Sequence, residues 1–135
     1  MSIALQRKSG EALSQTVHIR QHLLLSDVSV AEGGTDEGPS PHDLYDAALG
    51  SCKALTVLWY ARKKGIPVKD IQTEVLSDNS EERKGTYRLS TRLKISGDLT
   101  EAQLAELTSV AEKCPVHKLM TTVTTEITTS VERAA

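Results

Sequence analysis

The stretch DLYDAALGSCKALTVLWY, residues 43–60, has small or apolar side chains on almost every side of a helix and holds Cys52 near its middle. The pattern runs on to Lys64, and Gly65 and Pro67 then end it. A helix that is apolar nearly all round is typical of a buried position. We therefore expect a long central helix that is covered by a sheet or packed closely on another helix.

The start of this helix has the residues of a capping box. Ser40 suits the N-cap position, Pro41 the first helical position and Asp43 the third. The carboxylate of Asp43 also suits the positive end of the helix dipole. Before the helix, the Gly- and Pro-rich residues 31–41 are expected to form a loop whose backbone closely approaches a neighbouring element.

Strand patterns precede the long helix, and two strands, two helices and a Thr- and Val-rich strand follow it. Thr100 and Gln103 predict a second capping box, and Pro115 ends that helix near Cys114 and opens a short one. The expected strands are residues 2–8, 15–27, 66–78, 86–97 and 122–132, and the expected helices are 41–64, 101–114 and 115–121. The sequence therefore predicts an α+β fold in a single domain, residues 1–135.

The composition limits the classes of function. The chain has no Phe, one Trp and three Tyr, so its core must rest on aliphatic residues or be shared with a partner subunit. A net charge of −2 gives no reason to expect nucleic acid or an anionic membrane as a partner. The N-terminal residues lack the apolar core of a signal peptide, and no apolar run approaches the roughly 20 residues that span a bilayer. We expect a soluble, cytoplasmic protein.

Cys52 and Cys114 are the only cysteines, and three interpretations of them remain open: buried core residues, part of a metal site, or a redox pair. Reactivity belongs to the thiolate, which the free amides at a helix N-terminus stabilise. That argument favours Cys114, the expected N-cap of the helix that Pro115 opens. Cys52 lies deep inside a helix, where no end of that helix can assist it.

A metal site would use Cys114 and His117, with Cys52 as a third ligand. The other imidazoles of the chain belong to His18, His22 and His42. A structural zinc site usually has two tight ligand pairs, and the sequence offers only one. We therefore expect no metal or other cofactor, and we expect His117 to be a capping or surface residue.

Two segments together resemble the OsmC/Ohr family of small thiol-dependent peroxidases. They are GGTDEGPSPHDLYDAALGSCKALTVLWYARKKGIPV, residues 33–68, and LAELTSVAEKCPVHKLM, residues 104–120. The combined motif is specific, because it joins Pro-x-x-Leu, a helical cysteine and a second cysteine followed by Pro-Val-His. The resemblance covers roughly residues 15–132 and is greatest to the smaller OsmC-like branch.

This resemblance implies an intertwined homodimer in which two long central helices pack together and the sheets of both chains wrap them. It implies that Cys52 is the peroxidatic thiol, which attacks an organic hydroperoxide and becomes a sulfenic acid. Cys114 would then be the resolving thiol that forms a disulfide with Cys52. A dithiol of the lipoyl type would restore both thiols. Here the resemblance outweighs the dipole argument that favoured Cys114.

The sequence departs from the family pattern ten residues before the first cysteine. The family's peroxidases have a Glu there, paired to an Arg that also holds the thiolate, whereas this chain has His42 followed by Asp43. Arg20, otherwise a solvated strand residue, is the best candidate for the arginine. Two alternatives to the peroxidase therefore stay open: a non-catalytic dimer that binds a small apolar or thiol ligand, and a redox sensor.

Overall fold

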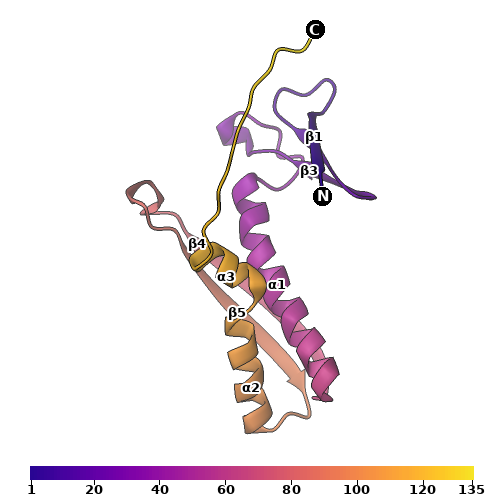
Figure 1. Ribbon diagram of the computed structural model, residues 1–135, viewed down its shortest axis with the longest axis vertical. Coiled ribbons are helices and arrows are strands. Elements are labelled where there is room, and N and C mark those ends of the chain that lie inside the picture. The colour runs from indigo at the N-terminus through magenta and orange to yellow at the C-terminus, as the bar shows by residue number, and fades with distance from the viewer. The chain divides into compact units, whose positions relative to one another are not determined.

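A computed structural model describes all residues, 1–135, and confirms the α+β fold class. The long strands and helices follow the order expected from the sequence up to residue 121 (Figure 1). The elements are β1 (Ile3–Arg7), β2 (Gln15–Ile19), β3 (His22–Ser26), α1 (Pro41–Lys64), β4 (Val68–Asp78), β5 (Arg88–Gly97), α2 (Glu101–Glu112) and α3 (Pro115–Thr121). Short 3₁₀ turns lie at Val30–Glu32 and Glu82–Lys84. No helix is both long enough and apolar enough to cross a membrane.

The chain divides into two compact units, which are described separately. The first consists of residues 1–48 and 75–89, and the second of residues 49–74 and 90–135. The helix α1 and the strands β4 and β5 each have one part in either unit.

The first unit contains the antiparallel sheet β1–β2–β3. Its register pairs Ile3 with Ile19, and Ile19 in turn with His22. The single strand expected over residues 15–27 is therefore wrong, because the chain reverses at Arg20 and Gln21 to form the β2–β3 hairpin. Arg20 adopts a left-handed backbone with φ of 53°, which lets a two-residue turn reverse the chain.

The loop before α1 is organised around the buried carboxylate of Asp27. This carboxylate accepts hydrogen bonds from the backbone amides of Val28, Thr35 and Glu37 and from the Thr35 hydroxyl. These donors, led by the Glu37 amide, lower the pKa of Asp27 to about 2. A Cβ at Gly38 would collide with the backbone of Leu25, so the expected close approach of the loop is confirmed.

The second unit has a small aliphatic core between α1, α2 and the β4–β5 sheet. Leu107 of α2 and Val57 of α1 are fully buried and pack together with Ala61 and Ile66. The half-buried aliphatic side chains Leu93 and Ile95 come from every second position of β5, as a one-sided strand requires.

Within the chain, α1 is covered along one stripe only. Its buried positions are Leu49, Lys53, Val57 and Ala61, which are four residues apart, and Gly50 next to Leu49, so they form a single face. Leu55 is 64% exposed and Trp59 61% exposed on other faces. Nothing in the single chain covers these side chains, so the expectation that sheets of two chains or a second helix cover them stays a prediction.

The predicted capping boxes are both present. Ser40 and Asp43 exchange hydrogen bonds between side chain and backbone at the start of α1, and Thr100 and Gln103 do so at the start of α2. The strand expected at residues 122–132 is wrong for the single chain, because residues 124–135 form no regular structure and pair with no strand. A strand needs the edge of another strand to satisfy its backbone groups.

Candidate functional site

Cys52 is half-buried on α1, and its sulfur receives a backbone hydrogen bond from a distant segment. The amide of Val116, in the first turn of α3, lies 3.4 Å from Cys52 Sγ. The hydroxyl of Thr56, one turn further along α1, lies 3.9 Å from the same sulfur. The Val116 contact brings the first turn of α3 to the Cys52 sulfur.

Cys114 is completely buried and is the N-cap of α3, as expected. Its side chain makes no capping hydrogen bond. The free amide in the first turn of α3 is directed at Cys52 instead. The argument that assigned this helix end to Cys114 could not foresee that α3 packs against α1 and directs an amide at Cys52. Both cysteines are free thiols in the structure.

Lys53 is a residue that the sequence analysis missed. It follows Cys52 directly, is only 4% exposed, and donates to the Ala111 carbonyl oxygen at 2.7 Å. Its Nζ also lies 3.0 Å from Nδ1 of His117, which must accept because an ammonium group only donates. The expectation that His117 is a surface or capping residue is wrong. The signal that could have identified Lys53 was its position as a charged residue inside an otherwise apolar helix.

The side chain of Lys53 also lines a cavity of about 400 Å³ in the second unit. Most of the other lining side chains are apolar and come from β5 and α2, among them Leu93, Ile95, Leu104 and Leu107. Such walls suit the hydrocarbon part of a small molecule better than a strongly polar one.

His42, one of the predicted site residues, lies in the first turn of α1 within the first unit. Its Nε2 contacts both carboxylate oxygens of Glu82 at 3.0 Å, and its ring packs edge-on against Tyr87. The hydrogen bond and negative charge of Glu82 raise the pKa of His42 above its usual value. Tyr87 donates to the carboxylate of Asp46. The sequence held no signal for Glu82, which lies 40 residues from His42.

The other two predicted residues of the first unit have separate surroundings. Asp43 is engaged with Ser40 in the helix cap. Arg20 is exposed at the tip of the β2–β3 hairpin, and it forms no ion pair within the chain. The structure thus brings Cys52 together with the segment that contains Cys114 and His117, and it brings His42 together with Glu82. It does not pair Arg20 with Asp43.

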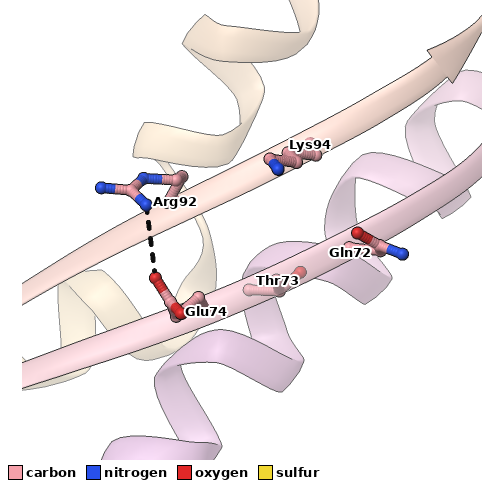
Figure 2. A pocket seen from close by; sticks show the side chains of 5 residues that line it. All are labelled: Gln72, Thr73, Glu74, Arg92 and Lys94. Atoms are coloured by element: carbon pink, nitrogen blue, oxygen red, sulfur yellow. Dashed lines mark hydrogen bonds and ion pairs between the residues drawn. The ribbon is translucent and has the colours of Figure 1, made fainter.

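Neither a surface depression nor a metal centre offers an alternative site. A depression on β4 and β5 is lined by Gln72, Thr73, Glu74, Arg92 and Lys94, with Arg92 and Glu74 in an exposed ion pair at 3.5 Å (Figure 2). It contains no nucleophile and lies on the solvated side of the sheet. No group of three or more His, Cys, Asp or Glu side chains lies close enough to hold a metal ion.

A comparison with known proteins shows the family of this chain. The model of a protein family described as OsmC-like protein matches residues 34–130, which is most of the chain. The chain belongs to the OsmC-like family. The matched range includes Cys52, Lys53, Cys114 and His117, whereas Arg20 lies outside it. No curated protein matches the sequence.

Solved structures share the OsmC-like fold at low sequence identity. An OsmC-like protein from Mycoplasma pneumoniae is 20% identical, with a TM-score of 0.72 and coverage of 90% of this chain and 87% of that one. An organic hydroperoxide resistance protein from Legionella pneumophila is 18% identical, with a TM-score of 0.61 and coverage of 90% of each chain. The organic hydroperoxide resistance protein OhrB of Bacillus subtilis is 21% identical, with a TM-score of 0.57 and coverage of 90% of this chain and 92% of that one. At these identities the likeness shows the fold alone.

Proposed function

We propose that the protein is a cytoplasmic thiol-dependent peroxidase that reduces organic hydroperoxides to alcohols. The observation that carries the proposal is the hydrogen bond from the Val116 amide to the sulfur of Cys52. This hydrogen bond brings a segment that starts two residues after buried Cys114 to the Cys52 sulfur. Family membership and the named hydroperoxide resistance proteins of the same fold support this activity.

In the proposed reaction, the Cys52 thiolate attacks the distal oxygen of the hydroperoxide. The O–O bond breaks, the alcohol leaves with a proton, and Cys52 becomes a sulfenic acid. The Cys114 thiol then attacks that sulfur, so that the S–S bond forms and water leaves. A dithiol of the lipoyl type reduces the disulfide and is itself oxidised to a cyclic disulfide. The exposed apolar side chains of α1 support an organic peroxide rather than hydrogen peroxide, because an apolar surface binds the hydrocarbon part.

We further propose that the active form is a homodimer. Proteins of the OsmC-like family are typically dimeric. The exposed apolar side chains of α1, which include Leu55, Leu58 and Trp59, form a surface that a second copy would bury. Arg20, His42 and Asp43 remain proposed members of the site. Glu82, held by His42, is an additional candidate for the carboxylate that would orient an arginine.

The test is turnover of cumene hydroperoxide with dihydrolipoamide as the reductant, for the wild type, Cys52→Ser and Cys114→Ser. We expect Cys52→Ser to lose activity, because no sulfur remains to attack the peroxide. Without the reductant, Cys114→Ser should consume about one equivalent of peroxide per chain and then stop at the sulfenic acid. Full activity in Cys52→Ser would reject Cys52 as the nucleophile. No activity in the wild type would reject the peroxidase proposal and favour a ligand-binding role.

A further inference from the structure

One ammonium group of α1 makes two hydrogen bonds to the junction between α2 and α3. Lys53 Nζ donates to the carbonyl of Ala111, in the last turn of α2, and to His117, in the first turn of α3. Cys114 lies between these two partners in sequence. One side chain therefore restrains the chain on both sides of that cysteine.

The partners of Lys53 are unusual for a buried charge. A lysine as buried as this one normally pairs with a carboxylate, because taking a charge out of water has a large cost. Here no carboxylate forms an ion pair with it, and its partners are a carbonyl and an imidazole. The carbonyl is at the C-terminal end of α2, where the helix dipole is negative and favours a cation. The ammonium is thus stabilised only while the junction keeps this position.

The same junction also touches Cys52. The Val116 amide donates to Cys52 Sγ, so adjacent residues of α1 make three hydrogen bonds to the segment of residues 111–117. Consecutive helical residues do not face each other. Lys53 is therefore placed to hold the segment that contains Cys114, and it is not placed to contact the Cys52 sulfur with its ammonium.

We propose that Lys53 is a positioning residue that holds the α2–α3 junction so that Cys114 can form a disulfide with Cys52. This inference rests on the proposed chemistry of the two cysteines. The step it promotes joins the two sulfurs: the Cys114 thiol displaces water from the Cys52 sulfenic acid, or a disulfide oxidant takes two electrons and two protons from the two thiols. Without the ammonium, the junction loses two of its three hydrogen bonds to α1, and the effective concentration of Cys114 at Cys52 falls.

The test measures the equilibrium between the two thiols and oxidised dithiothreitol, and it needs no peroxide. The Cys52–Cys114 disulfide is quantified by mass spectrometry for the wild type, Lys53→Met and the matched control Lys113→Met. Lys113 is exposed at the same junction and makes no side-chain hydrogen bond. We expect Lys53→Met to lower the equilibrium constant for disulfide formation about tenfold or more, because two hydrogen bonds of a charged group are lost. Lys113→Met should stay near the wild-type value.

A second variant keeps the test valid if Lys53→Met folds poorly. His117→Leu removes one of the two acceptors, and we expect a smaller decrease in the same equilibrium constant. Thermal unfolding of each reduced variant shows whether it is folded at the temperature of the measurement.

An unchanged equilibrium constant in folded Lys53→Met would overturn the proposal and leave the lysine a purely structural role. A wild type that forms no Cys52–Cys114 disulfide would overturn it as well. If the disulfide forms and depends on Lys53 while no peroxide is reduced, the peroxidase proposal fails and the positioning role of Lys53 stands.

Discussion

At the scale of single residues, the surroundings of each reactive side chain come from partners far away in the sequence. Cys52 receives its donor from Val116, and Lys53 receives an acceptor from His117, each 64 residues away. His42 obtains a carboxylate from Glu82 at a separation of 40 residues. The residue types could be predicted to be reactive, but their electrostatic environment could not, because it depends on which distant segments pack together.

The pair of His42 and Glu82 leads to a prediction at this scale. Glu82→Gln should lower the pKa of His42 towards the unperturbed value of 6.5, since the charge and the acceptor that raise it are replaced by a neutral amide. The raised pKa also means that the pair contributes to stability below about pH 6.5 and that this contribution disappears as the pH rises through the pKa of His42. An NMR titration of the His42 ring measures the shift.

Glu81→Gln is the matched control for this prediction. Glu81 is the neighbouring glutamate, and it pairs with Arg88 rather than with His42. Its replacement should leave the titration of His42 as in the wild type. An unchanged pKa in Glu82→Gln would show that the pair does not form in solution.

At the scale of elements, local signals determine where helices begin, and long-range packing determines what they cover. Both capping boxes form as the sequence predicts, because their partners are three residues apart. The β2–β3 hairpin was missed, because Arg20 and Gln21 are not the usual residues of a two-residue turn. Pairing of β2 with β3 outweighs the local preference at that position.

Because of the loop between β3 and α1, the stability of the protein should depend measurably on pH in the acid range. The low pKa of Asp27 means that its carboxylate stabilises the fold above about pH 4, and that this contribution is lost as the pH falls towards about 2. Asp27→Asn should be less stable than the wild type near neutral pH. The NH2 group of asparagine would replace one acceptor oxygen and would face the N–H and O–H donors that surround the carboxylate. It should also lose less stability than the wild type between about pH 4 and about 2. Urea unfolding at a series of pH values measures both effects.

Asp36→Asn is the control in the same loop. Asp36 is exposed and has a left-handed backbone, which asparagine also adopts readily. Its urea midpoints should follow those of the wild type at every pH. If Asp27→Asn did the same, the hydrogen bonds to Asp27 would not contribute to stability.

At the scale of the whole molecule, the single chain leaves apolar surface that a soluble protein normally buries. The exposed faces of α1 and the unpaired residues 124–135 both lack partners within the chain. The sequence predicted that the helix is covered and that residues 122–132 form a strand, and the chain alone provides neither. The proposed homodimer accounts for the helix face, since a second copy would cover it.

Leu55→Glu should therefore weaken self-association. A charge placed in a buried apolar interface is costly, so we expect the dimer dissociation constant to rise by at least about tenfold. Val30→Glu, also an exposed apolar residue but in a 3₁₀ turn, is the control. Sedimentation velocity over a range of micromolar concentrations measures both variants. A monomeric wild type under these conditions would contradict the proposed dimer.

The sequence by itself determined the features that depend on neighbouring residues. These are the α+β class, the limits and caps of α1, the end of α2 shortly before Cys114 and the start of α3 at Pro115, because capping and periodicity act within a few residues. The specific motif around Cys52 and Cys114 also indicated the family. Only the tertiary structure decided that α3 directs its amide at Cys52, that Lys53 is buried beside His117, and that one stripe of α1 is covered. These features arise from contacts between segments about 60 residues apart, and no local pattern encodes which segments will meet.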